Sequence, residues 1–179
     1  MKPIFIIADH KKEEKTKFLQ ELTTLMHQEG FRILGFLTIH NEENDSYLIR
    51  NLQSNEEKLL MKHKRHPHQK QEHFQFMEEG IRAGQEWLTT ANPTEPFITV
   101  IDEIGYYELE DKVWGNTLTS LMHLDEPFLF TTTLKLLPAI IKKWKIHPAA
   151  VFYPQDFNKP YKISKQIIDT INMYQKNSF

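Results

Sequence analysis

The chain has 179 residues, no cysteine, and a formal net charge of -2 at pH 7. This length suffices for one domain with a sizeable core, and the lack of cysteine excludes disulfides, thiolate metal sites and cysteine nucleophiles. The small net charge does not require a polyanionic partner, and no apolar run approaches the roughly 20 residues of a membrane helix, so we expect a soluble, cytoplasmic protein.

The start of the chain predicts a βαβ unit. Residues 4–8 are a short apolar run typical of a central strand, and residues 15–29 carry apolar side chains at spacings of three and four, which indicates one apolar helix face. Gly30 is a stop signal for this helix, and residues 31–38 predict a second strand. A strand, a helix and a strand in this order predict a right-handed crossover.

The next part of the chain, residues 40–73, is less regular. Residues 46–52 and 58–64 predict a hairpin or a small antiparallel extension. Residues 73–76 predict a short strand, and residues 77–88 predict a helix. We therefore expect an irregular insertion at this place, followed by a turn-rich loop at residues 92–96.

A buried strand that ends in two acids is the most informative segment. Residues 97–101 are apolar or β-branched and run directly into Asp102 and Glu103, which is typical of a parallel strand buried on both faces. Ligands of open α/β sheets bind at the carboxyl ends of such strands. The pair looks like a Walker B strand, in which the first acid holds Mg²⁺ through its water shell and the second orients or deprotonates water. In a simpler interpretation, Asp102 is a helix N-cap and Glu103 is a solvated neighbour.

The rest of the chain continues the alternation of strands and helices. Strands are predicted at residues 128–132 and 149–153, and helices at residues 112–123, 134–145 and 163–174. Trp87, Trp114 and Trp144 each fall on an amphipathic helix pattern and are expected to pack in the core or at its edge. The alternation predicts one α/β domain over residues 1–179, a three-layer sandwich with a mostly parallel sheet and a small antiparallel extension.

A Walker B pair would require a phosphate-binding loop between the first strand and the first helix. Lys15 and Thr16 open the helix where the motif G-x-x-x-x-G-K-[ST] would place them, but Asp9 and Glu14 stand in place of its glycines. Glycine permits the left-handed angles that turn backbone N–H groups toward phosphate, and another residue in that conformation costs roughly 1–2 kcal/mol. We therefore predict a degenerate Walker A loop.

The charges of this loop allow two interpretations. Two carboxylates beside a triphosphate repel it, and Lys11 and Lys12 could offset part of the repulsion, so both lysines are candidate nucleotide-binding residues. Alternatively, Glu13 and Glu14 only follow the general preference for acids in the first turn of a helix.

Taken together, these segments resemble the small stand-alone P-loop nucleoside triphosphatases of the cancer-related nucleoside triphosphatase family. The resemblance spans roughly residues 3–145 and is most specific at residues 102–109, Asp-Glu-Ile-Gly-x-x-Glu-Leu. Within that segment, Tyr106 and Tyr107 replace the family's usual proline and apolar residue, and they either close the pocket or only pack. Weaker matches are Lys15-Thr16, Gly30-Phe31, Gly35-Phe36, Phe74-x-Phe76, Gly80 and Gly84.

The resemblance implies a nucleoside-triphosphate site with Mg²⁺. Lys15 would contact the β- and γ-phosphates, Thr16 would ligate Mg²⁺, Asp102 would hold the Mg²⁺ shell, and Glu103 would activate water. Family members often carry a basic residue near the strand that follows, where Lys135 is the nearest cation.

Two functions remain open from the sequence. The first is a protein that binds ATP or GTP and hydrolyses it slowly with Mg²⁺, and the intact pair Asp102 and Glu103 favours it. The second is an inactive scaffold that acts through a protein partner or another ligand, and Asp9 and Glu14 favour it.

Four histidines, three lysines and one arginine lie within residues 62–73. A metal site needs ligands on a rigid frame, whereas Pro67 and the interleaved lysines favour a solvated loop. The same lysines could contact nucleic acid. Affinity for nucleic acid needs many phosphate contacts, and one basic loop in a chain of net negative charge offers few, so we do not expect a nucleic-acid partner.

Overall fold

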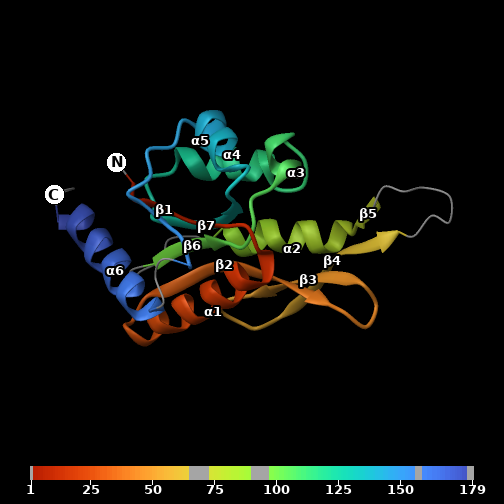
Figure 1. Ribbon diagram of the computed structural model, residues 1–179, viewed down its shortest axis with the longest axis horizontal. Coiled ribbons are helices and arrows are strands. Elements are labelled where there is room, and N and C mark those ends of the chain that lie inside the picture. The colour runs from red at the N-terminus through yellow and green to blue at the C-terminus, as the bar shows by residue number, and fades with distance from the viewer. Residues whose placement is uncertain (1, 65–72, 90–96, 156–158, 177–179) are drawn as a thin grey trace.

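An eight-stranded sheet runs through the computed structural model (Figure 1). The structure describes residues 2–64, 73–89, 97–155 and 159–176. Within these ranges, the side chains of residues 12, 13, 64 and 73 are not described. The strands are β1 (Ile4–Asp9), β2 (Arg32–Asn41), β3 (Ser46–Asn51), β4 (Glu57–Lys64), β5 (His73–Phe76), β6 (Phe97–Ile101), β7 (Phe128–Thr133) and β8 (Ala150–Phe152). Their spatial order is β5-β4-β3-β2-β6-β7-β1-β8. Strands β2, β6, β7, β1 and β8 pair in parallel, while β3, β4 and β5 extend antiparallel from β2. This confirms the predicted sheet with its small antiparallel extension.

The helices form a layer on each side of the sheet (Figure 1). On one side lie α1 (Lys12–Gln28) and α6 (Pro160–Lys176), and on the other lie α2 (Glu78–Leu88), α3 (Tyr106–Leu109), α4 (Gly115–His123) and α5 (Leu137–Trp144). The chain is therefore the three-layer α/β sandwich that the alternation of elements predicts.

Each face of the sheet packs against its own hydrophobic core. Along β1, Ile4 and Ile6 belong to the core under α4 and α5, whereas Phe5 and Ile7 belong to the core under α1 and α6. Successive side chains of a strand point to opposite faces, so a strand covered on both sides must be apolar throughout. This explains why β1 is buried at every position and its apolar run shows no alternation.

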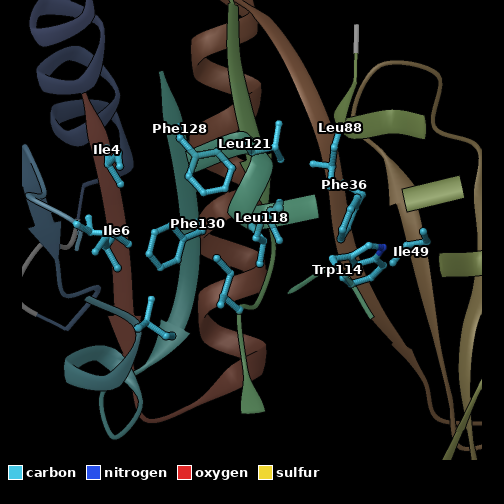
Figure 2. Packing of buried hydrophobic residues seen from close by; sticks show 14 of the residues in the cluster. Ile4, Ile6, Phe36, Ile49, Leu88, Trp114, Leu118, Leu121, Phe128 and Phe130 are labelled. Carbon is cyan, nitrogen blue, oxygen red and sulfur yellow. The ribbon is translucent and has the colours of Figure 1, made fainter. Parts of the chain in front are cut away.

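Trp114 anchors the core between α2 and the sheet. Its ring lies 4.6 Å from the ring of Phe36, centroid to centroid, and its Nε1–H donates to the carbonyl of Ile81 at 3.1 Å (Figure 2). Trp87 and Trp144 are half-buried at the edge of the same core. The three tryptophans therefore take the packing roles expected of them, although Trp114 precedes α4 rather than lying within a helix.

Gly35 allows β2 to pair with β6 because it has no Cβ. Its φ is +104°, and a Cβ at this position would stand 1.9 Å from the carbonyl oxygen of Val100, so only glycine fits. The pairing that results sets Phe36 opposite Ile101. It places the end of β2 directly beside the residues that follow β6.

The structure corrects two predicted helices. Helix α1 begins at Lys12, one turn before the predicted start at residue 15. The helix predicted at residues 112–123 begins only at Gly115, and the short α3 precedes it. The cause is non-local, because Lys143 of α5 donates to the carbonyl groups of Glu108 and Leu109 at 3.2 and 2.7 Å and so caps the end of α3.

Two predicted segments are not described. The loop at residues 92–96 and most of the histidine-rich stretch, residues 65–72, lie outside the described residues. In the part of the chain that is described, no helix combines the length and hydropathy needed to cross a bilayer.

Candidate functional site

Asp102 is held rigidly at the carboxyl end of β6. Its side chain is almost fully buried, and Oδ2 accepts hydrogen bonds from the Thr16 hydroxyl at 2.7 Å and the Thr38 N–H at 3.0 Å. Its Oδ1 accepts a hydrogen bond from the Thr131 hydroxyl at 2.8 Å. These donors come from α1, β2 and β7, so the carboxylate joins three elements and does not cap a helix.

Lys15 and Glu103 form a second contact between the same two segments. Lys15 is fully buried, and its Nζ lies 3.8 Å from Oε1 of Glu103. A buried ammonium is costly unless a negative charge compensates it, and Glu103 supplies that charge. Glu103 is therefore more than a solvated neighbour of Asp102, since 20% of its side chain is exposed and its N–H donates to the Thr131 hydroxyl at 2.8 Å.

The connection between β1 and α1 is shorter than the glycine-rich motif requires. Strand β1 ends at Asp9 and α1 begins at Lys12, which leaves only His10 and Lys11 between them. Neither Asp9 nor Glu14 has a positive φ, so the left-handed strain expected at these two positions is absent from the described loop. Glu14 already lies within the first turn of α1.

Asp9 occupies the place where the motif would have its first glycine. It is almost fully buried, and its Oδ1 accepts hydrogen bonds from the His10 N–H at 2.5 Å and from Nε2 of Gln155 at 3.1 Å. Its other oxygen, Oδ2, is buried without a hydrogen-bond partner among the described residues. A carboxylate in this position opposes an incoming anion.

The structure describes the side chains of Lys11 and Lys135 but not that of Lys12. Lys11 is largely exposed and forms an ion pair with Glu14 at 3.0 Å. Lys12 begins α1, but its side chain lies outside the described part of the chain. No side chain caps the N-terminus of α1, and the first N–H groups of a helix have no intrahelical partner, so they can receive an anion. Lys135, in the middle of the turn after β7, is exposed.

Thr38 and Thr131 complete the site, and the sequence did not point to either. Thr38 donates both its N–H and its hydroxyl to Asp102, the hydroxyl to the backbone oxygen at 3.0 Å. Their only signal is a polar residue near the carboxyl end of an otherwise apolar strand. That signal becomes specific only once the sheet order places β2 and β7 on either side of β6.

Glu108 holds the turn that follows Glu103. It is almost fully buried, and its Oε2 accepts the N–H of Gly105 at 2.9 Å. Burial raises the pKa of the Glu108 carboxyl above its usual value, and hydrogen bonds from backbone N–H groups oppose that rise. The glutamate of the Asp-Glu-Ile-Gly-x-x-Glu-Leu segment is thus a structural residue that closes a turn.

Two hollows flank Thr38 at this edge of the sheet. One of about 340 Å³ lies between α1 and the β2–β3 hairpin and is lined by Thr16, Lys17, Arg50 and others. The second, of about 230 Å³, is lined by Glu103 and by mainly apolar and aromatic side chains on the opposite side.

The histidine-rich stretch contributes no metal cluster in the described residues. His63 lies in β4, and its Nδ1 is 3.0 Å from a carboxylate oxygen of Asp45. His66 and His68 lie outside the described residues, as does the side chain of His73.

One family model and two solved structures are similar to this chain. A family model described as NTPase matches residues 5–168. The solution structure of a human cancer-related nucleoside triphosphatase is similar over 98% of both chains, with a TM-score of 0.63 and 15% identity. The crystal structure of THEP1 from the hyperthermophile Aquifex aeolicus is similar over 96% of this chain and 99% of that chain, with a TM-score of 0.60 and 14% identity. The search of curated proteins found no match.

Proposed function

This chain belongs to the NTPase family, and from that premise we propose that it binds ATP or GTP at the carboxyl edge of its parallel strands and hydrolyses it slowly. One observation carries the proposal. The contacts Lys15–Glu103 and Thr16–Asp102 bring a buried cation, a hydroxyl and two carboxylates together where α1 begins and β6 ends.

The donor set at this edge fits Mg²⁺. Thr16 and Asp102 offer hydroxyl and carboxylate oxygens, which are the ligands that Mg²⁺ prefers, and the two oxygens lie 2.7 Å apart. We propose that these two residues hold the ion or its water shell. When bound, the ion supplies charge neutralisation on the phosphate oxygens.

Other residues of the site bind the phosphates and activate water. Lys15 contacts the terminal phosphates, and the free N–H groups at the start of α1 donate to them, with Lys11 and Lys12 adding positive charge at the rim. As Lys15 turns to the phosphates, the carboxylate of Glu103 becomes available to orient water and take its proton. Asp9 and Glu14 oppose the anion, which is why we expect weak binding and slow turnover.

An inactive scaffold is the second candidate, and Asp9 favours it. Its buried carboxylate stands at the position of a phosphate-loop glycine, and the shortened connection leaves few backbone N–H groups to surround a phosphate. Such a protein would keep the fold and act through another ligand or a protein partner at the same edge.

Thermal unfolding with Mg-ATP and with Mg-GTP distinguishes the two. A ligand at 100 times its dissociation constant adds about 2.7 kcal/mol, which raises the midpoint of a protein this size by several degrees. We expect such a rise in the wild type, its loss in Lys15→Met, and its retention in Lys165→Met, which changes an exposed lysine on α6. Phosphate release should fall by about 10²-fold or more in Glu103→Gln, with binding kept.

No shift with either nucleotide would overturn the proposal. If Asp9→Gly combined with Glu14→Gly then created binding, the site would be the relic of an ancestral one. If it created none, the search should turn to protein partners.

A further inference from the structure

The hollow beside Glu103 is built from distant parts of the chain. It lies on the α2–α5 side of the sheet, holds about 230 Å³, and its wall joins β4, β5, the segment around α3, and the turn after β7. Most of that wall is apolar, formed by Leu60, Met61, Phe76, Val113, Trp114 and Leu136. Carboxylates and threonine hydroxyls supply its polar edge.

Two exposed tyrosines stand among its lining residues. Tyr106 is 56% exposed and Tyr107 is 39% exposed, although both lie on the short α3 directly beside an apolar wall. The ring of Phe76 meets Tyr107 edge-on, with centroids 4.7 Å apart. Large aromatic rings left exposed at the rim of an apolar hollow are suited to cover a planar ligand.

Two of the six described non-glycine residues with a positive φ lie on the same wall. Glu103 has a φ of 76° and Val113 a φ of 52°, and both line the hollow. Positive φ is unfavourable for any residue with a Cβ and is a clear outlier for a β-branched one such as valine. Strain of this kind persists where it serves a site, so the wall is shaped at a cost in stability.

Charge and size restrict what the hollow can hold. Among its described lining residues none is lysine, arginine or histidine, and the Lys15 ammonium next to it is already paired with Glu103, so the lining offers no cation to an anionic ligand. An engineered apolar cavity of about 150 Å³ binds benzene, and this hollow is larger. One aromatic ring with substituents therefore fits.

We propose that this hollow binds a small aromatic molecule that is neutral or cationic, with its ring on the apolar wall and a hydroxyl or amino group donating to Glu103. This hollow adjoins the proposed phosphate site, and binding of the aromatic molecule does not depend on nucleotide binding. The two would share the carboxylate of Glu103, so an occupant would meet the proposed water-activating group directly.

The test measures the binding of p-cresol to the full chain. Saturation-transfer NMR detects the bound p-cresol, and titration of the protein chemical shifts gives the affinity. We expect binding at millimolar concentration or below, and at least about tenfold weaker binding of 4-methylanisole, which has the same ring but no donor for the carboxylate. Tyr106→Ala should weaken p-cresol binding about three- to tenfold, and Tyr161→Ala, which removes an equally exposed tyrosine on α6, should not change it. Met61→Trp fills the hollow and should abolish binding.

Several results would overturn the proposal. These are no transfer from the wild type to p-cresol, equal affinity for 4-methylanisole, or equal affinity in Tyr106→Ala, which changes an exposed residue and therefore keeps the fold. If ATP displaces p-cresol but inorganic triphosphate does not, the hollow holds the nucleotide's own base and is no separate site. A nucleotide-induced thermal shift without p-cresol binding would leave the nucleotide site standing and remove only this one.

Discussion

Asp102 and Glu103 are neighbours in sequence, but their carboxylates are held in different ways. Three hydrogen bonds of 2.7–3.0 Å fix Asp102, whereas the contact between Glu103 and Lys15 is 3.8 Å long, beyond hydrogen-bonding distance. A fixed carboxylate suits a group that positions an ion, and a carboxylate with a looser contact suits one that changes partners during a reaction. These different contacts fit the separate roles that we propose for the two acids.

The stability of the protein should depend on the ionisation of Glu108. Because the pKa of Glu108 is raised in the folded state, the folded state holds the proton more tightly than the unfolded state. The free energy of unfolding should therefore fall as the pH rises above the usual value of 4.5, and the loss should be complete above the folded-state pKa. Denaturant unfolding at a series of pH values should show this loss in the wild type and a flatter profile in Glu108→Gln.

Glu21→Gln is the control for this prediction. Glu21 is exposed on α1, on the other side of the sheet from Glu108, so its replacement removes a surface carboxylate and leaves the buried carboxyl in place. Equal profiles for the wild type and Glu108→Gln would contradict the assignment of the effect to this buried carboxyl.

At the scale of elements, the contact between β2 and β6 determines whether the site forms. Gly35→Ala would place a Cβ 1.9 Å from the Val100 carbonyl oxygen at a φ of +104°. We expect a loss of roughly 1–3 kcal/mol from strain alone, with a further loss from the steric conflict. Denaturant unfolding measures it, and the thermal shift with Mg-ATP should shrink as Thr38 moves away from Asp102.

Gly30→Ala separates the cost of backbone strain from the cost of the steric conflict between β2 and β6. Gly30 also has a positive φ, +86°, but a Cβ there would meet no atom within 4 Å. Its replacement should cost only the strain of the left-handed conformation, about 1–2 kcal/mol, and leave the nucleotide shift unchanged. If both variants lose the same stability, the close approach of β2 to β6 does not matter.

The sequence predicted most elements because their signals are local. Apolar runs marked β1 and β6, and the segments at residues 46–52 and 58–64 predicted the β3–β4 hairpin. It missed the short α3 and the late start of α4, because Lys143 caps α3 from another helix and the turn between them contains Val113 in a conformation that valine seldom adopts.

The candidate site was predictable to a similar degree. Lys15, Thr16, Asp102 and Glu103 followed from motif spacing, and the structure brings all four together. Thr38 and Thr131 could not be found in this way, because their hydrogen bonds to Asp102 depend on which strands lie next to β6. Strand order is a property of the whole sheet and leaves no mark on any one segment.

At the scale of the whole molecule, we propose that residues 1–179 unfold as one domain. Both cores draw on the same central strands, so the loss of either helix layer would expose an apolar face of the strands that also carry the other core. Calorimetry should give one transition with equal calorimetric and van 't Hoff enthalpies, on the order of 125 kcal/mol near 60 °C if the full length takes part.

Tryptophan fluorescence and far-UV circular dichroism should follow that transition together. All three tryptophans belong to the core on the α2–α5 side, so their fluorescence reports on one layer while dichroism reports on every helix and strand. Separate midpoints would show that the antiparallel extension or one helix layer unfolds on its own.

The order of the strands also bears on how the protein behaves in a crowded solution. The sheet ends on its two shortest strands, β8 with three residues and β5 with four. The outer edge of a sheet offers unpaired N–H and C=O groups to which a second chain can add, and short edge strands offer few of them. The long apolar strands lie inside the sheet. If their edges were exposed, they would offer the most N–H and C=O groups for pairing with a second chain. The same arrangement that brings the site together thus also protects the protein against edge-to-edge aggregation.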